Sequence, residues 1–491
     1  MDNIGQLFLQ NVAENPSEPA LIDGPRSISH GQLAEASMAI ALGLRDRGLQ
    51  RGSTIAIRSH DPALLLASLF ATSLTGSRWV YAHANLVGSS QLDVDLILDD
   101  AGPETAQLPG STKLDTSWFQ RPAGEGKGQP FPFPQDHRPN DVWMISQTSG
   151  TTGTPKLVGL SQSVMLGRFS ANSQRFQWDG IRLASLFPAS APIFLTYALT
   201  ALLHRGAVVT GCQPHEWRQQ GVGLVLASPM QAQLVLSELQ LSMKVPALQL
   251  SGGPETQTLV RKLLKSFDRV LAGYGSTEAF NALVNEKTLG ANDEIITTTS
   301  LSPGVAVELV DEADVPVQKG QEGLVRIANS YLATGYLNAP EAQAATFRDG
   351  WFYPGDLGIW AASGELLITG RTNDQFNIGG KKLNAQVMDA VLLDVPGVCD
   401  AISFMMPGLD GSDGLRVFLS VAPEVDITTI ISEARIALMR LGGLAAVPKR
   451  FLLADVLPRN ANGKANRRAC VAMVEQAKAN RQKLREHTAR S

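Results

Sequence analysis

The sequence predicts an α/β protein with a large N-terminal domain of parallel α/β sheets, a β-rich subdomain and a small α+β C-terminal domain. Two observations support this fold class. Before residue 303, segments with helical spacing of apolar residues alternate with short apolar runs, which is typical of parallel sheets. After Arg371, about 120 residues with strands of their own remain, enough for a small separate domain.

The first elements alternate helix and strand. Apolar residues recur at helical spacing over residues 33–49, and residues 54–58 then predict a short strand. Another apolar helix is expected from Pro62. This alternation indicates an α/β arrangement from the beginning of the chain.

Three later apolar runs, residues 224–227, 248–250 and 269–272, each end in Ser or Gly. Such runs predict buried parallel strands with loops at their carboxyl ends, where open α/β sheets bind ligands. Two of these loops are candidates for binding: Ser251-Gly252-Gly253 and Gly273-Tyr274-Gly275-Ser276-Thr277-Glu278.

Between Pro303 and Ile368 the pattern changes to short alternating strands punctuated by Gly, Pro and Asp. This change predicts the β-rich subdomain. Residues 401–405 and 416–421 predict strands of the small C-terminal domain.

Composition argues against several classes of protein. The chain has 42 Lys and Arg against 46 Asp and Glu, a net charge of −4, so no basic field attracts nucleic acid. Cys212, Cys399 and Cys470 fit neither a disulfide framework nor a metal site, and they indicate a reducing cytoplasm. The apolar runs 63–71 and 193–203 are too short to span a bilayer. We therefore expect a cytoplasmic protein without a transmembrane segment, whose partners are small molecules.

The most informative stretch is Thr148-Ser149-Gly150-Thr151-Thr152-Gly153-Thr154-Pro155-Lys156. Its glycines allow backbone N–H groups to converge on an anion, its hydroxyls add donors, and Lys156 adds positive charge. A triphosphate fits this chemistry, so the segment predicts ATP binding. It is not the common P-loop, because Pro155 precedes the lysine and Leu157 follows it.

Further motifs follow this segment in order. They are Tyr274-Gly275-Ser276-Thr277-Glu278-Ala279, Gly335-Tyr336-Leu337, residues 351–358, residues 370–380 and Pro458-Arg459-Asn460-Ala461-Asn462-Gly463-Lys464. Together they resemble the acyl-adenylate-forming superfamily of acyl-CoA synthetases, free-standing adenylation enzymes and luciferases. The resemblance covers nearly the whole chain.

The resemblance implies a reaction in two steps. A carboxylate attacks the α-phosphorus of ATP, pyrophosphate leaves, and a thiol then attacks the acyl-adenylate. Because two anions meet in the first step, positive charge is required. Lys464 matches the family's lysine that bridges the carboxylate and the α-phosphate oxygens.

The same resemblance assigns the nucleotide contacts. Glu278 matches the residue that helps to hold Mg²⁺, and Thr277 would supply a hydroxyl to the α-phosphate. Asp356 matches the carboxylate that accepts hydrogen bonds from both ribose hydroxyls, Arg371 the arginine that contacts ribose and phosphate, and Tyr274 would stack on the adenine. The expected ATP-binding set also contains Thr148, Ser149, Gly150, Thr151, Thr152, Gly153, Lys156, Gly253, Gly275 and Ser276.

The small domain is implied to be mobile. Lys464 must enter the site for the first step, yet the thiol needs access for the second, so the domain rotates about a hinge. The implied division is an N-terminal ATP- and acid-binding domain at 1–371, a hinge at 372–374 that contains Asn373, and a mobile C-terminal domain at 375–491. Gly379 and Gly380 would line a tunnel for the pantetheine arm, with a plain Gly-Gly turn as the alternative.

The sequence departs from the family pattern at several positions. Asn373 stands where many members have a charged hinge residue, Pro354 where Thr is usual, and Gln162 where His is frequent. Residues 187–192 lack the His or second aromatic residue that often gates the acid pocket. The core catalytic groups remain, so these departures bear on rate, domain rotation and substrate.

The substrate is expected to be an acid without an α-amino group. Residues 189–200 contain no acidic side chain that could bind an ammonium group. An apolar aliphatic or aromatic acid is therefore expected, in a pocket formed by Phe194, Tyr197, Ser251, Gly252, Gly273 and Phe280.

The sequence leaves the acceptor open. The leading interpretation is an AMP-forming carboxylic acid:CoA ligase that uses ATP, Mg²⁺ and CoA. One alternative is a ligase that loads a separate carrier protein, and another is a nucleotide-binding regulator with reduced catalysis. Whether the chain forms a homodimer is open as well.

Overall fold

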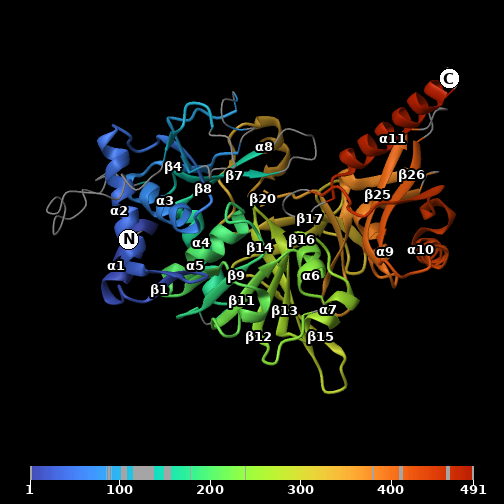
Figure 1. Cartoon of the computed structure of the whole chain (residues 1–491), viewed down its shortest axis with the longest axis horizontal. Coiled ribbons are helices and arrows are strands. Elements are labelled where there is room, and N and C mark those ends of the chain that lie inside the picture. The colour runs from blue at the N-terminus through green and yellow to red at the C-terminus, as the bar shows by residue number, and fades with distance from the viewer. Residues whose placement is uncertain are drawn as a thin grey trace.

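The computed structural model describes residues 3–83, 86, 89, 91–100, 108–113, 138–148, 156–176, 178–237, 239–378, 381–407, 413–459 and 465–488. It leaves out the side chains of Asn373, Pro407, Asp413 and residues 481–488. Sheets and helices of the first three quarters of the chain form one large body, and the C-terminal elements lie at one end of it (Figure 1).

One sheet of the large body has seven strands among the described residues, in the order β18-β8-β7-β4-β3-β5-β6. The strands from β7 to β6 along this order pair in parallel, whereas β8 pairs antiparallel with β7 and β18. Its strands are β3 (Thr54–Ser59), β4 (Arg78–Tyr81), β5 (Leu96–Asp100), β6 (Thr112–Lys113), β7 (Val142–Thr148), β8 (Lys156–Ser161) and β18 (Gly335–Tyr336).

A second sheet has nine strands in the described part of the chain, in the order β15-β14-β13-β12-β11-β9-β10-β1-β2. Its strands are β1 (Pro19–Asp23), β2 (Arg26–Ser29), β9 (Arg182–Ser185), β10 (Ala207–Thr210), β11 (Val222–Ala227), β12 (Val245–Ser251), β13 (Phe267–Ser276), β14 (Phe280–Leu289) and β15 (Ile295–Leu301). The predicted strands at 224–227, 248–250 and 269–272 are β11, β12 and β13, and they pair in parallel as expected.

Helices fill the space between the two sheets. These are α1 (Ile4–Glu14), α2 (His30–Asp46), α3 (Pro62–Thr75), α4 (Gln162–Ser173) and α5 (Pro192–Leu203). One hydrophobic core joins them to residues such as Ile57 of the first sheet and Leu226 of the second. The opposite face of the nine-stranded sheet packs against Trp217, which follows η2 (Pro214–Glu216), and against α6 (Pro229–Val235) and α7 (Gln257–Leu263) through a separate core. Alternate strand residues therefore face different cores, as the two-residue repeat of a strand requires.

One local expectation was wrong. We expected the strand near residue 270 to end at Ala272 and a loop to follow, but β13 continues to Ser276 and forms an antiparallel hairpin with β14. The hairpin brings the carbonyl of Phe280 so close to Gly275 that a side chain at position 275 would collide with it. Tyr274 is therefore held by a strand ladder, which restrains it more than a loop would.

The β-rich subdomain forms as predicted. It contains a six-stranded sheet among the described residues, with the order β19-β20-β17-β21-β22 and with β16 paired to β17. The elements are β16 (Ala306–Val310), β17 (Glu322–Ala328), α8 (Pro340–Thr346), β19 (Phe347–Arg348), β20 (Trp351–Phe352), β21 (Asp356–Trp360) and β22 (Leu366–Arg371).

The C-terminal elements have cores of their own, whose buried residues all follow residue 382. The elements are η3 (Thr372–Asp374), β23 (Gln375–Ile378), β24 (Lys381–Asn384), α9 (Ala385–Leu393), β25 (Val398–Pro407), β26 (Asp413–Val421), α10 (Ile427–Gly442), η4 (Gly443–Ala446), β27 (Arg450–Leu453) and α11 (Arg467–Thr488). The predicted strands at 401–405 and 416–421 lie in β25 and β26. A hinge at 372–374 stays a prediction.

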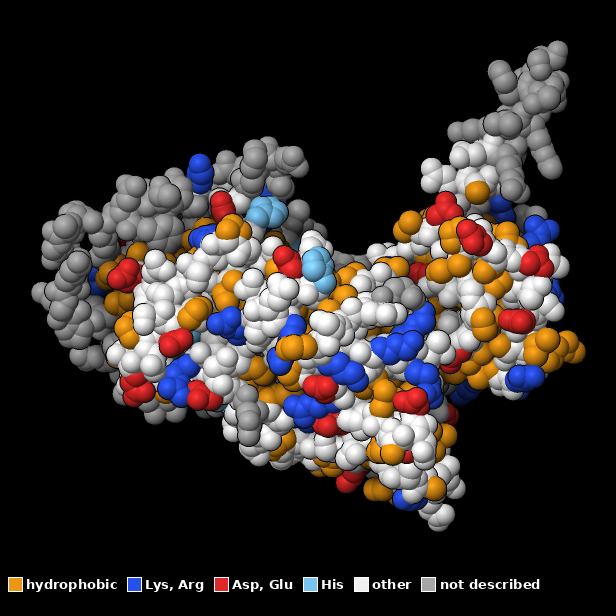
Figure 2. Space-filling model, turned by 60° about the horizontal axis from the view of Figure 1, so that its bottom comes forward, with side chains coloured by type: hydrophobic (Ala, Val, Ile, Leu, Met, Phe, Trp, Pro, Cys, Tyr) orange, Lys and Arg blue, Asp and Glu red, His pale blue; other side chains and the backbone are white. Residues whose placement is uncertain are grey.

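The surface carries charges of both signs. On the face drawn in Figure 2, basic and acidic side chains are interspersed among apolar and neutral ones. Within the described residues, no helix is both long and apolar enough to cross a bilayer.

Candidate functional site

The candidate site begins with an ion pair between neighbouring strands. Asp356 is the first residue of β21 and Arg371 the last of β22, and the antiparallel register places them opposite each other. Arg371 Nε donates to Asp356 Oδ1 over 2.7 Å, and Tyr274 Oη donates to Asp356 Oδ2 over 2.7 Å. The three residues assigned to adenosine therefore lie in direct contact.

Burial governs the protonation of this triad. Asp356 is only 5% exposed. Burial raises the pKa of Tyr274 well above its ordinary value, and the neighbouring Asp356 carboxylate raises it further. Burial alone would lower the pKa of Arg371, but Asp356 reverses this effect and the pKa is raised. The tyrosine is thus a neutral donor and the arginine a permanent cation.

The turn that carries Thr277 and Glu278 is held by an arginine that the sequence analysis missed. Arg168 of α4 is 2% exposed, and its Nη2 donates to the carbonyl oxygens of Thr277 (3.0 Å) and Glu278 (3.1 Å). Its Nε donates to the Tyr331 carbonyl over 3.3 Å. Burial lowers the pKa of Arg168 to about 9, and Glu278 opposes this effect, so the side chain stays charged at neutral pH. The sequence offered one signal for this residue: an arginine among apolar residues of a helix, which indicates a buried charge with a specific partner.

Lys156 and Glu278 approach the same aromatic ring. Lys156 Nζ lies 4.6 Å from the centroid of the Tyr336 ring, and Tyr336 Oη donates to Glu278 Oε1 over 2.8 Å. Thr148, the last residue of β7, pairs with Lys156, the first residue of β8. The residues between them include Ser149, Gly150, Thr151, Thr152 and Gly153, and they lie outside the described residues.

Three residues predicted for the acid pocket, Tyr197, Ser251 and Gly273, lie next to neutral polar side chains. Tyr197 Oη accepts from Asn281 Nδ2 (2.8 Å) and donates to Gln249 Oε1 (3.3 Å). The Oγ atom of Ser251 is buried and has no hydrogen-bond partner among the described residues. A Cβ atom at Gly273 would lie 2.6 Å from Gln249 Nε2 and 3.4 Å from Ser251 Oγ. Because Gly273 has no side chain, it does not collide with the polar atoms of Gln249 and Ser251 that lie next to it.

The other residues predicted for the pocket, Phe194, Phe280 and Gly252, lie in three different surroundings. Phe194 lies on α5 with Tyr197, and both are almost fully buried in the core between the sheets. The rings of Tyr197 and Phe280 lie 6.3 Å apart. Gly252 follows β12 with φ +97°, a conformation that favours glycine, and Gly253 comes next. The sequence analysis missed Gln249 and Asn281, although a glutamine inside an apolar strand was a usable signal.

Several predicted residues of the C-terminal part lie outside the described residues: Gly379, Gly380 and Lys464. The backbone of Asn373 lies in η3. Arg459 donates to both carboxylate oxygens of Asp400, at 2.9 and 2.6 Å, just before the gap that contains Lys464.

Arg467, just after this gap, donates to Asp389 Oδ2 over 2.5 Å. The antiparallel bridge between Arg459 and Ala465 also joins the two flanks. Two ion pairs therefore anchor the chain on either side of residues 460–464.

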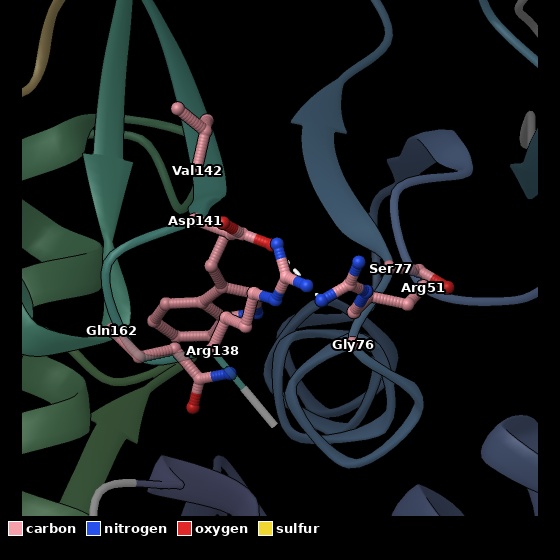
Figure 3. Close-up of a pocket in the computed structure, with 8 residues that line it drawn as sticks. Arg51, Gly76, Ser77, Arg138, Asp141, Val142 and Gln162 are labelled. Atoms are coloured by element: carbon pink, nitrogen blue, oxygen red, sulfur yellow. Dashed lines mark ion pairs between the residues drawn. The ribbon is translucent and has the colours of Figure 1, made fainter. Parts of the chain in front are cut away.

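Gln162 has a structural role at the far end of the β7–β8 hairpin from Lys156. Its Oε1 accepts from Ser73 Oγ (2.7 Å) and from the backbone N–H of Ile4 (2.8 Å), which anchors α1. The small pocket beside it is lined by Arg51, Gly76, Ser77, Arg138, Asp141, Val142, Trp143 and Gln162, and Figure 3 shows the guanidinium groups of Arg51 and Arg138 next to each other beside Asp141. The replacement of a frequent histidine by Gln162 thus falls away from the nucleotide residues.

The described residues contain no cluster of three or more His, Cys, Asp or Glu side chains suited to a metal ion. Glu278 is the predicted metal ligand, and no described residue donates to its Oε2. Mg²⁺ is usually bound by one or two carboxylates together with substrate phosphates, so a single carboxylate oxygen fits this ion.

Comparison with known proteins places the fold and the motifs in a family. The model of the AMP-binding enzyme family matches residues 8–337. Pseudomonine synthase PmsE of Pseudomonas entomophila (strain L48) is 26% identical over 504 residues, covering 92% of this chain and 80% of that protein. A feruloyl-CoA synthase of Amycolatopsis sp. is 26% identical over 493 residues, covering 94% and 97%.

Among solved structures, O-succinylbenzoate coenzyme A synthetase from Bacillus subtilis in complex with ATP and magnesium ion has a similar fold. The TM-score is 0.78 at 19% identity, with 94% of this chain and 98% of that chain covered. The arrangement of sheets and helices described above is therefore the fold of this family.

Proposed function

Because the chain belongs to the AMP-binding enzyme family, we propose that it is an AMP-forming ligase that joins a carboxylic acid without an α-amino group to the thiol of CoA. The chain is an ATP-dependent ligase. The proposal concerns the acid, the acceptor and the roles of individual residues.

The main support is the contact between Tyr274, Asp356 and Arg371 beside the Glu278 turn. The buried Asp356 carboxylate would accept hydrogen bonds from the ribose hydroxyls, and Arg371 would hold it in place. The Tyr274 ring would bind the adenine face. Lys156 would contribute positive charge to the phosphates, and Glu278 and Thr277 would lie next to them. Mg²⁺ bound at Glu278 would neutralise phosphate charge as pyrophosphate leaves.

The neutral polar side chains around Tyr197 support an acid that lacks an ammonium group. Tyr197, Gln249, Asn281 and Ser251 offer hydroxyls and amides, and none of them can form an ion pair with a cation. Aryl and fatty acids both satisfy this condition. An aryl acid is favoured, because the feruloyl-CoA synthase named above is similar over nearly its whole length.

The first test measures pyrophosphate release from ATP and Mg²⁺ with a panel of aryl, short-chain and long-chain acids, each with and without CoA. We expect catalytic release only when an aryl or fatty acid and CoA are both present. A single burst that CoA does not change would favour a separate carrier protein as acceptor. Binding of ATP without release for any acid would favour the regulator hypothesis.

A second test uses Lys464→Ala. Lys464 is proposed to stabilise the charge that develops between carboxylate and α-phosphate, so its loss should reduce acid-dependent pyrophosphate exchange by about 100-fold or more. Thioester formation from synthetic acyl-adenylate should be spared, since that step does not need this charge. Equal loss of both steps would contradict the assignment.

A further inference from the structure

The motif Gly335-Tyr336-Leu337 has no role in the proposed reaction so far. It forms β18 and pairs with β8, with Tyr336 opposite Val158. Leu337 N–H donates to the Leu157 carbonyl over 2.8 Å. These bonds fix the backbone of Tyr336 beside the beginning of β8, where Lys156 lies.

Glycine at position 335 is required by the same geometry. Gly335 has φ +127°, and a Cβ atom there would collide with the Gln343 side chain. Gln343 Oε1 accepts from the backbone N–H of Tyr336 over 2.8 Å. The backbone of Tyr336 is thus held from two sides, by α8 and by β8.

The Tyr336 side chain contacts two charged groups of opposite sign. Its ring face lies under the Lys156 ammonium, with Nζ 4.6 Å from the centroid. Its hydroxyl donates to Glu278 Oε1 over 2.8 Å. Phe347 packs against the ring edge, with centroids 5.5 Å apart and an interplanar angle of 75°. The orientation of the ring is therefore set by its neighbours as well as by the backbone.

The two carboxylate oxygens of Glu278 differ in their surroundings. Oε1 accepts a hydrogen bond from the Tyr336 hydroxyl, whereas no described residue donates to Oε2.

We propose that Tyr336 is a positioning residue that holds Lys156 with its ring and Glu278 with its hydroxyl, and so presents one cation and one carboxylate oxygen to magnesium-bound ATP. This inference rests on the proposed function, because it assumes that Lys156 and Glu278 serve ATP and its metal. It adds that two groups from distant parts of the chain are aligned by a single side chain. Tyr336 itself need not touch the nucleotide.

Two substitutions separate the two contacts. Tyr336→Phe removes the hydroxyl and keeps the ring, and Tyr336→Leu removes both. Binding of ATP to the full chain is measured by isothermal titration calorimetry, once with excess Mg²⁺ and once with EDTA. For Tyr336→Phe we expect affinity for ATP with Mg²⁺ to fall about tenfold, because the hydrogen bond to a charged group is lost. Affinity in EDTA should change less than about twofold, since Lys156 keeps its ring.

The leucine variant should weaken ATP binding in EDTA as well, because Lys156 then loses the ring. Tyr353→Phe is the matched control. It removes another buried tyrosine hydroxyl, which contacts Arg326 at 3.4 Å and no carboxylate, and it should leave both affinities unchanged.

The outcomes distinguish this inference from the proposed function. If the wild-type protein does not bind ATP with Mg²⁺, the proposed function fails. If it binds and Tyr336→Phe keeps or increases its affinity for ATP with Mg²⁺, the positioning role is wrong and the proposed function stands. Thermal unfolding verifies that each variant is folded, and Tyr336→Phe decides the question if the leucine variant does not fold.

Discussion

The nucleotide half and the acid half of the candidate site are built from different kinds of side chain. The nucleotide half consists of charged groups held by partners, such as Asp356 with Arg371 and Glu278 with Tyr336. The acid half consists of neutral groups, with Tyr197 shared between Gln249 and Asn281. ATP is always the same polyanion, so its half can be rigid and charged. The acid half can vary among hydroxyls, amides and apolar groups without disturbing the charges.

The largest effect is expected from Arg168, which donates hydrogen bonds to the turn that carries Thr277 and Glu278 in the nucleotide half. Arg168→Met removes a buried cation and its hydrogen bonds to the carbonyl oxygens of Thr277, Glu278 and Tyr331, of which the Glu278 oxygen keeps the backbone N–H of Ala333 as a donor. We expect the free energy of unfolding to fall by about 3 kcal/mol. Pyrophosphate release should fall as well, because the Thr277–Glu278 turn loses its support. Denaturant unfolding and pyrophosphate assays measure both.

Arg182→Met is the control for this experiment. Arg182 is an arginine of β9 that donates to one backbone carbonyl, that of Gln220. Its removal should cost no more than about 1 kcal/mol. Similar losses for the two variants would show that Arg168 has no special role at the turn.

A smaller effect is expected from Asp356→Asn, which tests the nucleotide half directly. The amide cannot replace a carboxylate that accepts from Arg371 and Tyr274, so affinity for ATP should fall by about 10- to 100-fold. The relative preference among acids should not change. Titration calorimetry with ATP and competition between acids provide the two measurements.

Glu308→Gln is the matched control for Asp356→Asn. It removes the partner of Arg326 in the same subdomain, away from the site, and should leave ATP binding intact. A change in acid preference with Asp356→Asn would contradict the separation of the two halves.

Tyr197→Phe tests the acid half. It removes the hydroxyl that joins Gln249 to Asn281, so these amides can present their polar atoms differently to the acid. We expect the ratio of kcat/KM between two acids to shift by about tenfold, with an unchanged KM for ATP. Steady-state kinetics with each acid measure the ratio. A proportional loss for every acid, together with a higher KM for ATP, would mean that the halves are not independent.

The smallest effect on activity is expected from Asp389, a buried carboxylate outside both halves, whose titration affects stability instead. Burial raises its pKa to about 6, while Arg467 acts in the opposite direction. Because the pKa is higher in the folded chain than the ordinary value of about 3.9, the folded state binds this proton more tightly. Its contribution to stability is therefore complete below about pH 4 and is lost as the pH rises to about 6.

Asp389→Asn should flatten the stability profile in this window by about 3 kcal/mol. The measurement compares denaturant unfolding of wild type and variant at several pH values. An unchanged difference between the two proteins across the window would show that Asp389 does not titrate there.

Much of the fold could be predicted because the local pattern and the tertiary environment agree. The apolar runs at 224–227 and 248–250 are buried on both faces, so their composition reveals parallel strands. The extension of β13 to Ser276 could not be predicted, because it depends on pairing with β14. Glycines at 273 and 275 suggest a loop locally, whereas the hairpin uses them for close approach.

The candidate site likewise contains residues that the sequence predicts and residues that it does not. Tyr274, Asp356 and Arg371 were predicted as site residues from short motifs, since each motif keeps its chemistry within a few residues. Arg168 and Asn281 were missed, because their partners lie far away in the chain: Arg168 contacts Thr277, more than 100 residues later. No spacing rule connects such pairs before the chain folds.

The sequence by itself determined the family and the α/β fold class, because these are written in local patterns of polarity and in short motifs, and the same motifs predict which residues bind the nucleotide. Only the tertiary structure decided which charges meet. The register of β21 and β22 places Arg371 opposite Asp356, and the pairing of β18 with β8 places Tyr336 between Lys156 and Glu278. The physical reason is that electrostatic contacts act over a few ångströms of space, and the distance between two residues along the chain does not predict that separation.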